Sequence, residues 1–143
     1  MKNKVVFFCL FFVLIACSKE KIADKKLNGD WSVDIVRIED GEGFAFYDSI
    51  PTGSLHFDAE NHFFSGQINY KYLNFENQLM YDTCIYETTT YNYLDSKADH
   101  ISFLNNGHVL NVRFVVLTKK SMVFEYYDLN KYRLIRFIAY KEN

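Results

Sequence analysis

The chain has 143 residues, of which 49% are hydrophobic, 18% aromatic and 24% charged, and its formal net charge at pH 7 is −2. This length suits a single domain with a hydrophobic core. A slightly acidic chain lacks the basic surface that nucleic-acid binding requires, and it has no general attraction to anionic lipid headgroups. We therefore expect no nucleic-acid partner.

The N-terminus has the order of features of an export signal. Two lysines precede an apolar stretch, Val5–Ile15, which is too short to span a bilayer comfortably. The stretch ends in Leu14-Ile15-Ala16-Cys17, which resembles the lipobox of bacterial lipoproteins. The resemblance implies cleavage after Ala16 and a diacylglycerol thioether on Cys17, with acyl chains such as palmitate. Residues 1–16 are thus expected to be a signal peptide.

The mature chain is then expected to be anchored to a membrane rather than to span it, because several acyl chains on one cysteine hold a protein firmly. It has 127 residues and, without Lys2 and Lys4, a formal charge of −4. Residues 17–26 are charged, with little apolar content, and are expected to form a flexible tether. Lys19-Glu20 resembles part of a sorting tag for surface lipoproteins. The expected location is the cell envelope, at the outer membrane, facing either the periplasm or the exterior.

Three cysteines are present, and only one remains available for other roles. Cys9 leaves with the signal and Cys17 carries the lipid, so Cys84 has no intrachain partner in the mature form. A lone thiol in an oxidising compartment is usually buried and inert. We expect no disulfide and no nucleophilic role for Cys84.

The rest of the chain has the pattern of strands, with frequent β-branched and aromatic residues and a single proline. In the first strand, Trp31, Val33 and Ile35 alternate with polar residues, as on a pleated surface. The expected strands are, in chain order, Asp30–Ile38, Phe44–Asp48, Ser54–Phe57, His62–Tyr72, Leu79–Tyr93, Ile101–Leu104, His108–Leu117, Met122–Asp128 and Tyr132–Tyr140.

Short turns connect these strands, among them Asp58–Asn61 and Asn105–Gly107, and no crossover helix separates them. Sequential hairpins at this spacing favour an antiparallel barrel or sandwich. We predict an all-β domain over residues 27–143, an up-and-down antiparallel barrel of about eight strands.

Three short motifs resemble the lipocalin-like (calycin) barrels of bacterial lipoproteins. Leu27-Asn28-Gly29-Asp30-Trp31 is similar to their L-x-G-x-W opening. The segment from Gly53 to Gly66 is similar to a G-x-L-x-F hairpin, and Leu117–Phe124 is similar to a penultimate hairpin of the family. The resemblance implies that Trp31 plugs the closed end of the barrel. It also implies that a basic residue of the last strand packs over the indole, with Arg133 and Arg136 as the candidates.

No motif for catalysis or for cofactor binding is present. The chain lacks a phosphate-binding glycine loop, H-E-x-x-H, paired C-x-x-C and G-x-S-x-G. His56 and His62 flank one turn, but two histidines alone do not make a zinc site. We expect no enzyme activity, no cofactor and no metal.

Large aromatic side chains are the remaining candidates for function. An eight-stranded barrel is either filled by its own side chains or holds one small ligand. The leading hypothesis is a monomeric, non-enzymatic lipoprotein that binds a small apolar or amphipathic molecule in the barrel. The alternative is a solidly packed module that binds another protein or a glycan. The candidate ligand contacts are Phe57, Phe64, Tyr70, Phe124 and Tyr126.

Overall fold

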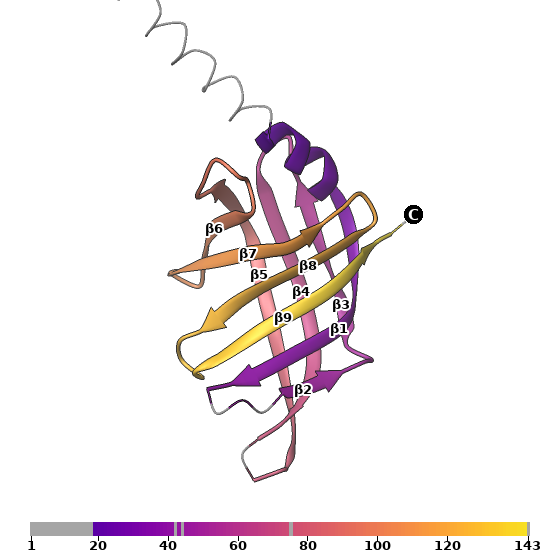
Figure 1. Ribbon diagram of the computed structural model, residues 1–143, viewed down its shortest axis with the longest axis vertical. Helices are drawn as coiled ribbons and strands as arrows, with labels where there is room; N and C mark the ends of the chain where they lie inside the picture. The colour runs from indigo at the N-terminus through magenta and orange to yellow at the C-terminus, as the bar shows by residue number, and fades with distance from the viewer. Residues whose placement is uncertain (1–18, 42, 44, 75, 143) are drawn as a thin grey trace, which may run out of the picture.

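The computed structural model describes residues 19–41, 43, 45–74 and 76–142. The expected signal peptide and Cys17 therefore lie outside the described residues. Nine strands form one sheet that curves into a barrel (Figure 1). They are β1 (Gly29–Asp40), β2 (Ala45–Asp48), β3 (Thr52–Asp58), β4 (Phe63–Leu73), β5 (Leu79–Tyr93), β6 (His100–Asn105), β7 (His108–Leu117), β8 (Ser121–Asp128) and β9 (Arg133–Lys141).

Eight of the nine strands form a closed antiparallel barrel. β3 to β8 each pair with the next strand in sequence, and β1 pairs with β3. The barrel closes where β1 pairs with β9, from Trp31 opposite Lys141 to Asp40 opposite Arg133. β2 is the extra strand, and it pairs with the second half of β1. The predicted all-β domain, an up-and-down antiparallel barrel of about eight strands, is confirmed.

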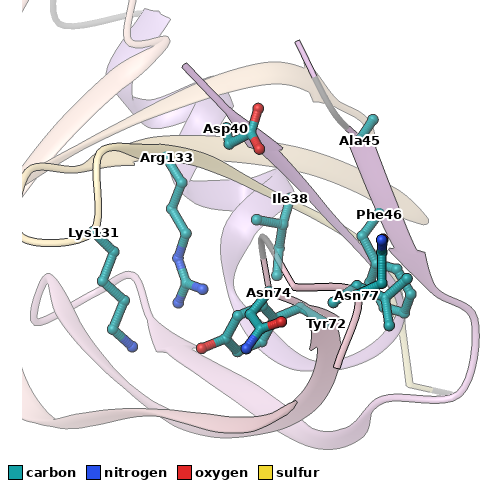
Figure 2. A pocket seen from close by; sticks show the side chains of 10 residues that line it. Ile38, Asp40, Ala45, Phe46, Tyr72, Asn74, Asn77, Lys131 and Arg133 are labelled. Carbon is teal, nitrogen blue, oxygen red and sulfur yellow. The ribbon is translucent and has the colours of Figure 1, made fainter. Parts of the chain in front are cut away.

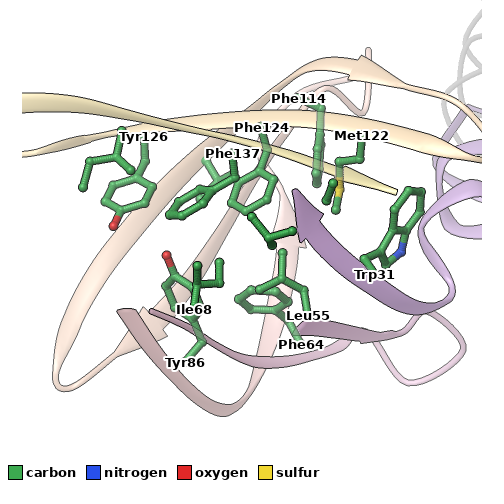
Figure 3. Close-up of a cluster of buried hydrophobic side chains, with 14 of the residues drawn as sticks. Trp31, Leu55, Phe64, Ile68, Tyr86, Phe114, Met122, Phe124, Tyr126 and Phe137 are labelled. Atoms are coloured by element: carbon green, nitrogen blue, oxygen red, sulfur yellow. The ribbon is translucent and has the colours of Figure 1, made fainter. Parts of the chain in front are cut away.

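The interior follows a period-two pattern in β3 and β4 but not along all of β1. The expectation that Ile35 faces inward with Trp31 and Val33 is wrong, because a bulge between Val33 and Ile35 makes Val36 and Ile38 the buried residues. Leu55 and Phe57 on β3 face the same side as Phe64, Ile68 and Tyr70 on β4, and all are buried. Figure 3 shows large side chains filling the space between Trp31 at one end and Tyr86 and Tyr126 at the other. The aromatic residues thus act first as core.

Close strand contact inside the hairpin depends on a glycine. At Gly66, an added Cβ would lie 2.6 Å from Leu55 Cδ2 and 2.7 Å from the Ser54 carbonyl oxygen. The register of β4 against β5 shifts between Phe64 and Gly66, which marks a β-bulge. Bulges increase local twist and help a sheet curve into a barrel.

The segment expected to be a flexible tether is helical over residues 19–27, which corrects that expectation. Ala23 and Leu27 are buried against the barrel. Asp24 accepts hydrogen bonds from the hydroxyls of Tyr91 and Tyr93, at 3.2 and 2.7 Å. The helix is therefore fixed over one end of the barrel, and tertiary contacts rather than local propensity explain it.

Trp31 lies at this end, as expected, but its basic partner differs from the prediction. The indole is fully buried, and its Nε1 donates a 2.7 Å hydrogen bond to the Leu27 carbonyl. The cation over its ring is Lys141, with Nζ 5.1 Å from the centroid. Arg133 and Arg136 lie elsewhere, because the β1–β9 register places Lys141, not an arginine, opposite Trp31.

Candidate functional site

A pocket of about 520 Å³ opens at the end of the barrel opposite Trp31. Its volume falls in the range of small-molecule sites, roughly 300–1,000 Å³. Apolar and polar groups share its wall, as Figure 2 shows. The lining residues are Ile38, Asp40, Ala45, Phe46, Tyr72, Leu73, Asn74, Asn77, Lys131 and Arg133. We call this the mouth pocket.

Two turns and the extra strand place the walls of the mouth pocket. In the β4–β5 turn, Asn74 Oδ1 accepts the backbone N–H groups of Glu76 and Gln78 at 3.0 and 2.9 Å. β2, which carries Phe46, is held to β4 by the buried Asp48, whose Oδ2 accepts the Lys71 N–H at 2.7 Å. These hydrogen bonds fix the polar and the apolar sides of the pocket relative to each other.

The β8–β9 turn supplies the cationic side. Asp128 Oδ1 accepts the backbone N–H groups of Asn130 and Lys131, at 3.0 and 3.3 Å, and so shapes the turn. Such side-chain-to-backbone bonds are a common way for Asp to form turns. In Figure 2 the side chains of Lys131 and Arg133 extend into the pocket on the side where Tyr72 lies.

Arg133 lines the mouth pocket from the inner end of the turn. Its side chain is 6% exposed. One terminal nitrogen donates to Tyr70 Oη at 3.0 Å and to Asp82 Oδ2 at 2.5 Å. The guanidinium carbon lies 4.6 Å from the centroid of the Tyr72 ring, a cation–π distance. Its Nε also lies 3.7 Å from Asp128 Oδ2, so two carboxylates and one aromatic face surround the charge of Arg133.

Asp82 is the carboxylate that pairs with the cations Lys131 and Arg133. It accepts hydrogen bonds from Lys131 and Arg133 as well as from the Tyr70 hydroxyl. Burial raises the pKa of Asp82, but the hydrogen bonds from Lys131 and Arg133 outweigh it and hold the pKa below its ordinary value. The pKa of Arg133 is raised: burial lowers it, and Tyr70 and Asp82 more than compensate. Asp82 and Arg133 are therefore both ionised at neutral pH.

A second polar group lies deeper in the barrel, where β4, β5 and β8 face one another. Cys84 Sγ lies 3.2 Å from Tyr126 Oη and 3.8 Å from Tyr70 Oη. The Tyr86 hydroxyl points toward Tyr126 (Figure 3), yet no described residue forms a hydrogen bond with it. Burial, more than any neighbour, raises the pKa values of Tyr70, Tyr86 and Tyr126, so these phenols stay protonated.

None of the five predicted ligand contacts lines the mouth pocket. The Phe57 ring packs on Phe64 with centroids 4.7 Å apart, and Phe124 stacks on Phe137 at 4.8 Å. Tyr70 and Tyr126 belong to the deeper polar group, and all five are buried. The structure thus locates the candidate site nearer the rim, beyond the packed interior.

The sequence gives little indication that the residues lining the mouth pocket form a binding site. Asn74, Asn77 and Lys131 lie in turns, where such residues are common for local reasons. Ala45 and Phe46 lie on a strand outside the closed barrel. Of the residues singled out from the sequence, Arg133 alone lines the pocket, and it was expected at the opposite end.

The histidines at the Trp31 end form local pairs with carboxylates. His100 Nδ1 lies 3.0 Å from Asp95 Oδ2 and 2.7 Å from Asp99 Oδ1, and these three are the one group with metal-ligand spacing among the described residues. Hydrogen bonding within the group accounts for this geometry. His56 pairs with Asp30 at 2.7 Å, rather than with His62 across the turn.

Within the described ranges, no helix is both long and apolar enough to cross a membrane. Comparison by sequence finds neither a matching family model nor a matching curated protein.

Solved structures with related barrels do match. The alignment with a redesigned β-barrel includes 85% of this chain and 96% of the other chain, with TM-score 0.42 and 10% identity. The bovine lipocalin allergen Bos d 2 covers 83% and 75%, with TM-score 0.41 and 10% identity. A deswapped triple mutant of bovine odorant-binding protein covers 82% and 74%, with TM-score 0.37 and 12% identity. These likenesses are too loose to carry an argument, so the barrel assignment rests on the strand order and its closure.

Proposed function

We propose that the chain is a non-enzymatic, lipid-anchored envelope protein that binds a small amphipathic molecule in the mouth pocket. The observation that carries the proposal is the two-sided wall of that pocket. Ile38 and Phe46 offer apolar surface, whereas Lys131 and Arg133 offer cationic donors. A molecule with an apolar body and a polar end satisfies both sides.

The charged groups of the pocket support binding rather than catalysis. Lys131 and Arg133 both donate to Asp82, so each already holds a partner. General acid–base catalysis needs a group whose pKa lies near the working pH. The pKa of Asp82 is instead displaced below its ordinary value.

The proposal is tested with full-length protein isolated from the membranes of its own host. Native mass spectrometry is expected to show a retained mass that is released on activation. Ala45→Trp places an indole at a lining position that is exposed, so the fold is preserved while the pocket is filled. Thr90→Trp, at an exposed position on the outside of β5, is the matched control.

We expect the Ala45→Trp variant to lose the retained mass and the Thr90→Trp variant to keep it. Retention that survives in both variants would rule out the mouth pocket. A folded wild-type protein without any retained mass would argue for the interaction module instead.

The interaction module stays a second candidate because exposed apolar side chains lie on hairpins at the open end. Val109 is 69% exposed on the β6–β7 hairpin, and Leu129 is 75% exposed on the β8–β9 turn. A partner protein that covers these hairpins would co-purify with wild type. It would be lost when Val109 and Leu129 are replaced by serine.

Anchoring is proposed from the lipobox, with Cys17 as the acylated residue and the outer membrane as the location. Mass spectrometry of the N-terminal peptide is expected to show a diacylglyceryl group on Cys17. Cys17→Ser is expected to remove that group, and a wild-type peptide without it would refute the anchor.

A further inference from the structure

The end of the barrel that carries Trp31 has a second pocket, of about 390 Å³, between helix 19–27, the β5–β6 loop and β7. Lys19 and Lys26 line it from the helix, and Lys97 lines it from the loop. Ile22 and Val115 add apolar surface that is 54% and 44% exposed. We propose that this face lies against the anionic phospholipid surface of the membrane that holds the protein.

Charge segregation supports the proposal. Lys141 extends the same face, since its Nζ donates to the Lys26 carbonyl at 2.9 Å and its N–H donates to the Lys120 carbonyl at 3.0 Å. Lys19, Lys26, Lys97, Lys120 and Lys141 are defined here as the lysine face. Among the ion pairs of the described residues, none uses a lysine of this face.

The carboxylate that lines the second pocket is already engaged. Asp99 Oδ1 lies 2.7 Å from His100 Nδ1, and among the ion pairs of the described residues Asp99 has no lysine partner. Lysines beside exposed apolar side chains are the combination that binds an anionic membrane interface. The domain is acidic overall, yet five of the 14 lysines and arginines that follow Cys17 belong to this face.

The position of the anchor points to the same surface, and this step rests on the proposed lipidation of Cys17. Cys17 is two residues before Lys19, and two residues reach at most about 7 Å. The helix cannot swing away freely, because Leu27 is fully buried and Asp24 is bonded to Tyr91 and Tyr93. The lipid therefore emerges beside the lysine face.

One consequence concerns the mouth pocket. β1 has 12 residues and runs from the Trp31 end to the mouth, a path of roughly 40 Å. With the lysine face on the bilayer, the mouth pocket opens away from the membrane that holds the protein. Ligand exchange then takes place with the solvent or with a partner on the far side.

The test uses lipidated protein in phosphatidylcholine vesicles that contain phosphatidylglycerol and a headgroup-nitroxide lipid. A fluorophore is attached at Ser96→Cys, in the β5–β6 loop, or at His108→Cys, at the start of β7, each with Cys84→Ser. We expect at least three-fold stronger quenching at position 96 than at position 108. Equal quenching, or stronger quenching at position 108, would overturn the inference.

The charges are tested in the same vesicles. Lys26→Gln with Lys97→Gln is expected to lower the quenching at position 96 to its level in pure phosphatidylcholine. Each lysine near an anionic surface is worth about five-fold in binding, which corresponds to ~1 kcal/mol. Lys71→Gln with Arg37→Gln removes the same charge from strands β4 and β1, away from the second pocket, and should leave the quenching unchanged. An equal loss of quenching in both double variants would show that only net charge matters, and it would overturn the inference.

The experiments distinguish an error in the proposed lipidation of Cys17 from an error in the proposed membrane contact of the lysine face. A protein that lacks lipid on Cys17 would not float with pure phosphatidylcholine vesicles, and its N-terminal peptide would have the unmodified mass. Its salt-sensitive binding to phosphatidylglycerol vesicles, weakened by the Lys26 and Lys97 substitutions, would still support the lysine face. Absence of that binding would refute both.

Discussion

Arg133 is the residue on which the candidate site depends most. The resemblance to lipocalin-like barrels placed it over Trp31, whereas the structure pairs it with Asp82 and stacks it on Tyr72. The two ends of β9 explain the difference. Arg133 begins the strand at the mouth and Lys141 ends it beside Trp31.

Replacing Arg133 with methionine should lower the free energy of unfolding by about 3 kcal/mol. The substitution removes a cation that pairs with Asp82, so the negative charge of that partly buried carboxylate is less well neutralised. The free energy of unfolding in denaturant measures the loss. Arg136→Met is the matched control. Its pair with Glu125 is more exposed, so about 1 kcal/mol is expected. Equal losses would contradict the structural role of Arg133.

Asp82 gives the site a defined dependence on pH. Its folded-state pKa lies below the unfolded value, near 3.9, so the carboxylate stabilises the fold above that pH. This contribution is lost as the pH falls through the folded-state pKa. The difference in unfolding free energy between wild type and Asp82→Asn should stay constant from pH 7 to about pH 5 and shrink below about pH 4. A difference that persists unchanged at pH 3 would contradict this.

At the scale of elements, the strands followed from local patterns and the helix did not. Alternation and turn residues predicted the β3–β4 hairpin, and the register of Leu55 opposite Gly66 bears it out. Residues 19–27 contain few apolar side chains, and a short helix is marginal by itself. Its stability comes from Ala23 and Leu27 packed on the barrel, a contact that no local pattern reveals.

Leu27→Ala should lower the free energy of unfolding by about 3 kcal/mol, because it leaves a cavity under the helix where the side chain is fully buried. Ile22→Ala, on the same helix but 54% exposed, should cost less than about 0.5 kcal/mol. Both are measured by denaturant unfolding. If the two substitutions cost the same, the helix is not docked as described.

At the scale of the whole molecule, the barrel separates two tasks. The mouth pocket lies at one end, among turns that vary in chemistry without disturbing the core. Helix 19–27, Trp31 and the lysine face lie at the other end. The proposed anchor and the proposed ligand site therefore do not compete for the same surface.

The sequence by itself determined the strand content and the hairpins, because alternation and turn chemistry act over a few residues. Alternation alone did not predict which side chains of β1 face inward after Val33, because a bulge there makes Val36 and Ile38 the buried residues. Only the tertiary structure decided that Phe57, Phe64 and Phe124 serve as packing and that Arg133 joins Asp82. Barrel closure and register bring together residues far apart in the chain, and a single sequence holds no local signal for those distances.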